Sequence, residues 1–304
     1  MTKSQLDNDK PLHILMFTWF AIGHLSSYLH LANKIAKKGH RISFIIPTKT
    51  IPKLAPLKRH PNLITFYPVS VPPVDGLPTG GETTNDVEPC DRPKIMDALE
   101  LTQDRIESYL AQLRPDLLFF DSTEWAPQLA RKYGAKPVYY AVFYVSMFAY
   151  CNLRARNLPP NHRVTEGDFR DPPPGFPTSG VRMRPHEARA VSRVFASDYG
   201  IGMSFLEKND RTLNESVAIG FRTCREMEGV YSDFFEKQIS KPVLLAGFLV
   251  PEPPLCSKLD DYFNDWLNEF SHGSVVYCAF GSECLLDLDQ FHELVLGLEL
   301  TVKS

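Results

Sequence analysis

The sequence predicts an α/β protein built around a mostly parallel β-sheet. Short apolar runs alternate along the chain with amphipathic segments of helical spacing. The runs at residues 13–20 and 41–47 are apolar almost throughout, which is typical of strands that are buried on both faces. This strand–helix–strand order favours a parallel sheet covered by helices on both faces and joined by right-handed crossovers.

The first half of the chain supplies most of the expected sheet. Helical spacing in the first amphipathic segment places Leu25, Leu29 and Ala32 on one face, and Gly39 is a plausible stop for this helix. The stretch at 71–91 is rich in proline, glycine and threonine, which indicates a loop. The strands expected here are residues 13–20, 41–47, 62–71, 115–121 and 137–142, and the helices are residues 25–39, 94–113 and 126–135.

The second half of the chain is interrupted by a proline-rich stretch. Residues 157–180 are too rich in proline for a regular element, so we expect a surface excursion there. Regular patterning returns at 217–223, 224–239 and 242–250, and the stiff "PEPP" at 251–254 follows as a connector. After it we expect a helix at 258–270, a buried strand at 274–282 and a helix at 286–300. These three elements cannot enclose a core of their own, so they either pack on the first domain or open a further one.

Composition excludes several classes of protein. The 304 residues carry a net charge of −3 without a basic stripe, which argues against a nucleic-acid partner. The six cysteines form no CxxC pair, so neither a zinc site nor a disulfide framework is indicated. The N-terminal residues lack the pattern of a secretory signal, and no apolar run approaches the roughly 18–20 residues needed for a transmembrane segment. We therefore expect a cytoplasmic monomer.

His24 is the first candidate catalytic residue. It lies where the first expected strand passes into the first expected helix, and Gly23 precedes it to allow a tight turn. Ligands of open parallel sheets bind beyond the carboxyl ends of the strands, where this turn should lie. Histidine titrates near pH 6.5 and can act as a general base, and a helix N-terminus favours the neutral ring from which a base must start. The alternative for a lone histidine at a helix start is a capping or surface role.

Asp121 is the expected partner of this histidine. It ends the strand "PDLLFFD", and Asp116 opens the same strand and therefore lies at the opposite edge of the sheet. A carboxylate in the position of Asp121 could hold one ring nitrogen of His24 and stabilise the imidazolium, as in a catalytic triad. The alternative for an aspartate at a strand end is a helix cap or a turn residue.

Six segments in this order resemble the plant UDP-sugar-dependent glycosyltransferases of family 1. The segments are "FAIGHLSSYLHLANKIAKKGHRISFIIP", "GGETTNDV", "PDLLFFDSTEWAP", "GFRTCREMEGVY", "KPVLLAGFLVPEPP" and "SVVYCAFGSE". The subgroup resembled most is the one that extends flavonoid or anthocyanin glycosides with a further sugar. The resemblance covers nearly the whole chain.

The resemblance implies a GT-B fold, in which two Rossmann-like domains face each other across a cleft. Residues 1–248 would then form the acceptor-binding domain, 249–272 the linker and connecting helix, and 273–304 the truncated start of the UDP-sugar-binding domain. In this likeness His24 deprotonates the acceptor hydroxyl and Asp121 is its partner. The oxygen attacks the anomeric carbon with inversion and UDP leaves; a UDP-sugar is the co-substrate, and no metal is implied.

One departure from the family concerns the donor site. The family's donor-binding signature, built around H-C-G-W-N-S with a later D-Q pair, is absent from the sequence. Gly281 and Ser282 remain at an expected strand-to-helix turn, where backbone N–H and hydroxyl groups could contact the diphosphate. A simple turn is the alternative for "FGS". Without a donor pocket the leaving diphosphate is not clamped, so we expect this chain alone to be inactive or nearly so.

Aromatic residues gather around the expected site and suit a flat phenolic acceptor, although most of these rings could equally be core residues. Phe17, Trp19, Phe143 and Phe148 belong to this aromatic group. The acceptor-binding residues that we expect are Phe20, Gly23, His24, Glu124, Trp125 and Tyr144. The excursion at 159–177 is either a lid or a mobile surface loop.

Two other functions compete with glycosyl transfer. One is a catalytically inactive protein that binds small phenolic molecules, which a truncated relative could still do. The other is an NAD-dependent Rossmann enzyme, but "FAIGHL" stands where the G-x-G-x-x-G fingerprint would follow the first strand.

Overall fold

The structure is a computed structural model, and it describes residues 10–158, 162–197, 204–248, 259–281, 284 and 286–302. The chain forms two compact units, Met1–Pro254 and Leu255–Ser304, which are described separately. The predicted linker at 249–272 lies partly outside the described residues.

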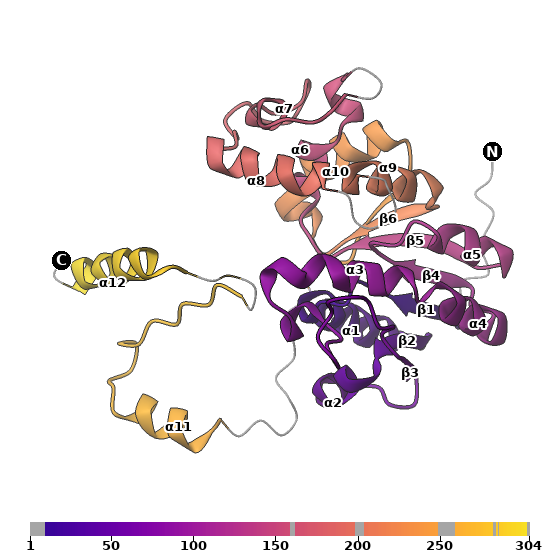
Figure 1. The fold of residues 1–304 in the computed structure, drawn as a ribbon, viewed down its shortest axis with the longest axis horizontal. Helices are drawn as coiled ribbons and strands as arrows, with labels where there is room; N and C mark the ends of the chain where they lie inside the picture. The colour runs from indigo at the N-terminus through magenta and orange to yellow at the C-terminus, as the bar shows by residue number, and fades with distance from the viewer. Residues whose placement is uncertain are drawn as a thin grey trace. The chain divides into compact units, whose positions relative to one another are not determined.

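The first unit is built on a parallel sheet of seven strands, and Figure 1 labels β1 to β6. The spatial order is β3-β2-β1-β4-β5-β6-β7, so the chain starts in the middle, moves to one edge, and returns to the middle at β4. Every neighbouring pair is parallel, and Phe17 of β1 lies beside Phe120 of β4. The strands are β1 (His13–Phe17), β2 (Arg41–Pro47), β3 (Ile64–Val69), β4 (Leu117–Phe120), β5 (Lys136–Ala141), β6 (Ala218–Phe221) and β7 (Val243–Leu245). The predicted α/β fold with a parallel sheet is confirmed.

Helices cover both faces of this sheet. Alternate residues of β1 explain the two layers, because Leu15 and Phe17 pack into one apolar cluster while Ile14 and Met16 pack into another. The first cluster joins α3, α4, α5, α6, α9 and α10, and the second joins α1 and α2. The helices are α1 (Ile22–Ala36), α2 (Ile51–Leu54), α3 (Arg92–Glu100), α4 (Gln103–Leu113), α5 (Ala126–Lys132), α6 (Val145–Cys151), α7 (Glu166–Arg170), α8 (Pro185–Ala196), α9 (Phe205–Glu215) and α10 (Arg225–Ile239).

The single helix predicted at 94–113 is wrong, because the chain forms α3 and α4 with a break between them. The break falls at Thr102, which is 2% exposed. Its hydroxyl donates to the carbonyl of Leu99 at 2.6 Å, and its own N–H donates to the same carbonyl at 3.0 Å. A threonine that bonds the backbone in this way competes with the regular helical ladder, and the helix restarts in a new direction.

The proline-rich stretch is more ordered than a simple surface excursion. It contains α7, and Phe169 of α7 is fully buried in a small third cluster with Tyr150 and Phe195. The Arg156 guanidinium donates to the carbonyls of Tyr150 (2.6 Å), Asp171 (2.9 Å) and Asp168, and so ties α7 to the end of α6. The prediction of a purely superficial segment is wrong because aromatic residues and one arginine supply a local core.

The second unit contains two helices in its described residues, α11 (Asp261–Asn268) and α12 (Leu288–Val302). The strand predicted at 274–282 is wrong for the described residues 274–281, which are irregular and exposed. A parallel strand needs a neighbour for its backbone N–H and C=O groups, and no other strand is present among the described residues of this unit. In the described part of the chain, no helix is both long and apolar enough to cross a bilayer.

Candidate active site

The candidate site lies at the switch point of the sheet, where the strand order reverses between β1 and β4. His24 lies in the first turn of α1, which follows β1, and Asp121 comes directly after β4. Because β1 and β4 are parallel neighbours, their carboxyl ends bring these residues together although 97 positions separate them in the sequence. A crevice beyond the carboxyl ends at a switch point is where open α/β sheets bind ligands.

Asp121 is a buried carboxylate with three donors around it. Its Oδ2 accepts from the Thr18 hydroxyl at 2.7 Å and from His24 Nδ1 at 2.8 Å, and its Oδ1 accepts from the Trp19 N–H at 2.6 Å. The side chain is 3% exposed, so these bonds replace the water that the carboxylate loses on burial. Ser122, which follows, has a left-handed backbone with φ of 55°, an uncommon conformation for a residue other than glycine. The carboxylate is therefore fixed in one orientation, toward β1.

The ring of His24 is oriented by this carboxylate. An ionised carboxylate only accepts hydrogen bonds, so Nδ1 carries the proton that it donates to Asp121, and in the neutral ring Nε2 is then the nitrogen with the lone pair. Phe143 packs edge-on against the ring, with centroids 5.3 Å apart. Among the described residues no hydrogen bond engages Nε2. The arrangement orients Nε2 toward the cavity side of the ring, and in the neutral form this nitrogen can act as a general base.

The turn that carries His24 is held by a buried segment at residues 82–84. The Thr84 N–H donates to the Phe20 carbonyl at 2.9 Å, just ahead of α1. Glu82 is 6% exposed and accepts from the Lys49 N–H at 2.7 Å. Burial raises the pKa of Glu82, while its backbone bond to Lys49 opposes that shift. The conspicuous "GGETTNDV" stretch thus supports the site from the side of β2.

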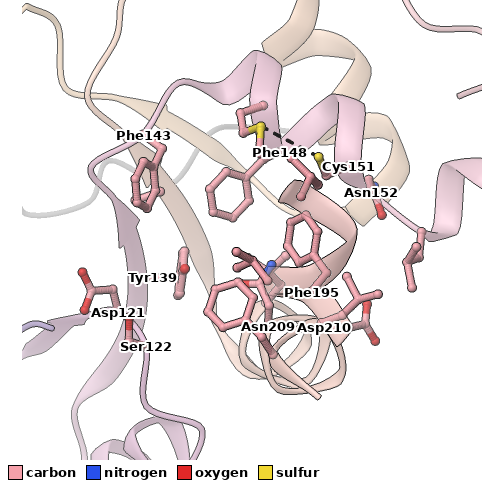
Figure 2. Close-up of a pocket in the computed structure, with 18 of the residues that line it drawn as sticks. Asp121, Ser122, Tyr139, Phe143, Phe148, Cys151, Asn152, Phe195, Asn209 and Asp210 are labelled. Atoms are coloured by element: carbon pink, nitrogen blue, oxygen red, sulfur yellow. Dashed lines mark hydrogen bonds between the residues drawn. The ribbon is translucent and has the colours of Figure 1, made fainter. Parts of the chain in front are cut away.

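A cavity of about 340 Å³ opens beside His24 and Asp121. Figure 2 shows Asp121, Ser122, Tyr139 and Phe143 on one side of it, and Asn152 and Asp210 on the other. Its wall is largely apolar, a composition that suits an aromatic ligand. The lining comes from the ends of β4 and β5 (Asp121, Ser122, Tyr139, Ala141, Val142, Phe143), from α6 and the residues after it (Met147, Phe148, Cys151, Asn152, Leu153), from α8 (Ala190, Val191, Val194, Phe195), from α9 (Phe205, Leu206, Asn209, Asp210, Leu213), and from His24 and Phe235.

One carboxylate of α10 fixes the helix that forms the middle of this wall. Glu228 is buried, and its two oxygens accept from the N–H groups of Val145 (3.2 Å) and Ser146 (3.0 Å) at the start of α6. These N–H groups have no partner inside the helix, so the carboxylate caps α6. The backbone of α10 departs from helical geometry at Glu228 itself. This cap places Phe148, Cys151 and Asn152 along the cavity.

The structure separates the predicted acceptor-binding residues into two groups. His24 lines the cavity, whereas the other five do not. Phe20 is fully buried in the core, and Gly23 lies exposed in α1, which begins at Ile22 and therefore needs no special turn at this glycine. Tyr144 is 57% exposed. For Phe20 the expected contact with acceptor is wrong in this structure, because core packing leaves its ring no free surface.

Trp125 and Glu124 are engaged elsewhere. The Trp125 Nε1–H donates to Glu100 Oε2 at 2.6 Å, and the ring packs against Phe17. Glu100 also pairs with the buried Lys208, so α3, α5 and α9 meet at one buried ion pair. Glu124 lies 3.8 Å from Arg211. Trp125 and Glu124 therefore hold neighbouring helices in place and do not form part of the cavity wall.

The predicted donor-binding residues lie in the second unit. Gly281 is exposed and has a left-handed φ of 88°, which glycine adopts without strain. Ser282 lies outside the described residues. A role for either residue in binding the diphosphate stays a prediction.

Sequence reasoning missed the wall formed by α8 and α9. In α8, Val191, Val194 and Phe195 fall on one helical face, and α9 repeats this pattern with Leu206 and Leu213. The helical spacing of apolar residues across 185–196 and 205–215 is the signal that could have found them. Of the aromatic group noted in the sequence, Phe143 and Phe148 line the cavity.

The reactivity of Cys151 tests whether its thiol is buried at the cavity wall. Burial raises the pKa of its thiol to about 12, so the reactive thiolate is scarce at pH 8. We expect N-ethylmaleimide at pH 8 to modify the exposed Cys90 promptly and Cys151 at least about tenfold more slowly, as followed by peptide mass spectrometry. Equal rates at the two cysteines would contradict the buried environment.

Comparison with solved structures defines the class of the fold. The chain is similar to Arabidopsis thaliana UGT89C1 in complex with UDP-L-rhamnose, with a TM-score of 0.70 at 16% identity, over 95% of this chain and 62% of that one. The same enzyme in complex with quercetin gives a TM-score of 0.69 at 17% identity, over 95% and 63% of the two chains. The fold is therefore that of the GT-B glycosyltransferases.

Sequence comparison identifies relatives among plant glycosyltransferases. The chain is 48% identical over 289 residues to the cyanidin 3-O-galactoside 2''-O-xylosyltransferase of Actinidia chinensis var. chinensis, which covers 95% of this chain and 63% of the relative. It is 43% identical over 289 residues to the anthocyanidin 3-O-glucoside 2''-O-glucosyltransferase of Ipomoea nil, with 95% and 62% covered. A scan against protein-family models gives no match. The chain is thus a homologue of the plant UDP-glycosyltransferases, and it spans about 63% of the length of the curated relatives it matches.

Proposed function

We propose that this chain forms the acceptor-binding part of a UDP-glycosyltransferase that extends a flavonoid or anthocyanin glycoside with a further sugar. The observation that carries the proposal is the 2.8 Å hydrogen bond between His24 Nδ1 and Asp121 Oδ2, at the wall of an apolar cavity. The names of the relatives from Actinidia and Ipomoea give the acceptor class, since both act on glycosides of anthocyanidins.

In the proposed reaction His24 is the general base and Asp121 its partner. The acceptor hydroxyl gives its proton to Nε2 of His24, and the oxygen forms a bond to the anomeric carbon of the donor sugar. The bond between that carbon and the UDP oxygen breaks, the electron pair leaves with UDP, and the configuration inverts. Asp121 stabilises the imidazolium that forms, because its buried carboxylate accepts from Nδ1 throughout.

The donor side of the reaction is proposed from the relatives. We infer that a UDP-sugar is the co-substrate, because the similar Arabidopsis structure binds UDP-L-rhamnose, and that no metal is required, as the resemblance to the family implies. Gly281 and Ser282 remain the proposed contacts to the diphosphate. We also propose that the protein is cytoplasmic and monomeric.

The chain by itself should bind acceptor without turning it over. In a titration followed by tryptophan fluorescence, we expect quercetin 3-O-glucoside to bind the 304-residue chain. With UDP-glucose or UDP-xylose added, mass spectrometry should find no diglycoside, because the leaving diphosphate is not clamped. Robust turnover would overturn the expected inactivity.

A matched variant decides whether the cavity is the binding site. Val191 lines the cavity from α8 and is partly exposed there, so Val191→Trp should fill the space and weaken binding at least about tenfold. The exchange Val230→Trp, at a residue that is 62% exposed on α10 and does not line the cavity, is the control. Equal binding by both variants would contradict the assignment of the acceptor site.

A catalytically inactive phenolic-binding protein is the second candidate function. One observation favours it, namely that every residue lining the cavity belongs to the first unit. A chimera distinguishes the two functions. In it, this chain is extended by the part of the Actinidia relative that the alignment leaves uncovered. Turnover by this chimera would support the transferase, and binding without turnover would support the binding protein.

A further inference from the structure

Two amide side chains are the unusual groups in the otherwise apolar cavity wall. Asn152 follows α6, and Asn209 lies on the face of α9 that carries Leu206 and Leu213 into the same cavity. Of the other polar groups in the wall, Asp121 is bonded as described and Asp210 pairs with Arg154 at 2.9 Å, while Ser122 and Tyr139 contribute hydroxyls from the ends of β4 and β5. On the side of the cavity formed by α6 and α9, the two amides are therefore the wall groups with hydrogen-bonding capacity to spare.

The orientation of Asn152 is fixed by its own loop. Its Oδ1 accepts from the Arg154 N–H at 3.1 Å, which sets the amide so that Nδ2 points away from that bond. Nδ2 is buried and has no hydrogen-bond partner among the described residues. A buried N–H donor without an acceptor costs about 1–3 kcal/mol, and a ligand oxygen relieves that penalty once the amide turns Nδ2 toward the cavity.

Asn209 supplies the second free amide. No hydrogen bond joins its side chain to another described residue, although its neighbours on α9 are all engaged: Lys208 with Glu100, Asp210 with Arg154, and Thr212 with the Lys208 carbonyl. Its amide can both donate and accept, so it suits a hydroxyl group. An asparagine on the cavity face of a helix, amid leucines and phenylalanines, has no packing reason to be there.

We propose that Asn152 and Asn209 determine acceptor specificity by hydrogen bonding to oxygen substituents on the aromatic ring that lies farthest from His24. The inference rests on the proposed function and adds the orientation of the acceptor within the cavity. Its sugar hydroxyl meets His24 at the Asp121 side of the cavity, its flat body fills the apolar middle, and its outer ring reaches the Asn152 side (Figure 2). The ligand is an elongated phenolic with oxygens at both ends and no anionic group, because the lining residues include no lysine or arginine.

The test measures binding to the 304-residue chain with two probes that differ in the outer ring alone. Quercetin 3-O-glucoside carries two hydroxyls on that ring, and galangin 3-O-glucoside carries none. We expect the chain to prefer the first probe about three- to tenfold, as one or two neutral hydrogen bonds would give. In Asn209→Leu the preference should fall by about threefold or more, with the galangin glucoside bound as well as before or better.

Two further variants sharpen the test. Gln128→Leu removes an exposed amide on α5 that does not line the cavity, and it should leave the preference unchanged. Asn152→Asp keeps the acceptor for the Arg154 N–H but replaces the Nδ2 donor with an oxygen. It should therefore weaken binding of a 3',4'-dimethoxy analogue, whose ether oxygens only accept, relative to the dihydroxy probe.

The outcomes separate this inference from the function on which it rests. Equal binding of both probes by the unaltered chain, or a preference that survives Asn209→Leu and Asn152→Asp, overturns the role of the amides while the acceptor site stands. Binding of neither probe overturns both. Unchanged near-UV circular dichroism shows that each variant is folded.

Discussion

Replacing His24 with alanine lowers kcat by about 10²–10⁴-fold in the chimera completed from the Actinidia relative, the usual contribution of a general base. The imidazole is the group at the cavity with a free basic nitrogen, and its orientation depends on the bond to Asp121 at 2.8 Å. Asp121→Asn gives a loss of similar size, because an amide can donate to Nδ1 and would turn the imidazole to the wrong tautomer. Initial rates with UDP-glucose or UDP-xylose as donor measure both effects.

Binding separates a chemical role from a structural one. UDP affinity, measured by titration calorimetry, should be the same in His24→Ala as in the parent chimera, because the histidine lies in the first unit at the acceptor cavity. Loss of UDP binding together with activity would show that His24 supports folding. Full activity in His24→Ala would remove the proposed mechanism altogether.

The second large effect concerns stability. Lys208→Met should lower the free energy of unfolding of the first unit by about 3–5 kcal/mol, because it leaves the Glu100 carboxylate buried without its counter-charge. The two side chains are only 3% and 12% exposed, so water cannot replace the lost partner. The new methionine itself fits, since the Lys208 ammonium already lies beside Met96. Urea denaturation followed by circular dichroism gives the change.

A double variant tests the cause. Glu100→Gln keeps an oxygen for the Trp125 Nε1–H and removes the charge, so Lys208→Met with Glu100→Gln should recover more than half of the loss. Lys237→Met, at an exposed position on α10, is the control and should change stability by less than about 0.5 kcal/mol. A double variant as unstable as Lys208→Met would assign the loss to packing instead of charge.

The sequence predicts the sheet well because its strands are apolar without interruption. A strand buried on both faces is a continuous apolar run, so it can be recognised without knowing which strands pair with it. Residues 13–20, 41–47 and 115–121 are examples. The same reasoning fails at residues 274–281, because an apolar run becomes a strand only where another strand pairs with it. It also fails at Thr102, where one hydroxyl–carbonyl bond divides a long amphipathic pattern.

Some residues of the candidate site could be predicted from the sequence and others could not. His24 and Asp121 could be placed together from the sequence, because both follow strands whose carboxyl ends meet at one edge of a parallel sheet. The aromatic residues could not be assigned, since Phe20 and Phe143 look alike in the sequence while one is fully buried and the other is 52% exposed. The amides of Asn152 and Asn209 depend on helices that meet only in three dimensions, so no local pattern connects them.

The two walls of the cavity belong to separate stretches of the chain. The dyad follows β1 and β4, whereas α6, α8 and α9 all lie in the single connection between β5 and β6. Within that connection, positions that line the cavity, such as Val191, Val194 and Asn209, can be exchanged without disturbing the strands that hold the dyad, whereas Lys208 must stay to pair with Glu100. Mutational drift within it would alter which molecules are accepted while leaving the chemistry intact, so transplanting residues 142–217 between relatives should transplant their selectivity.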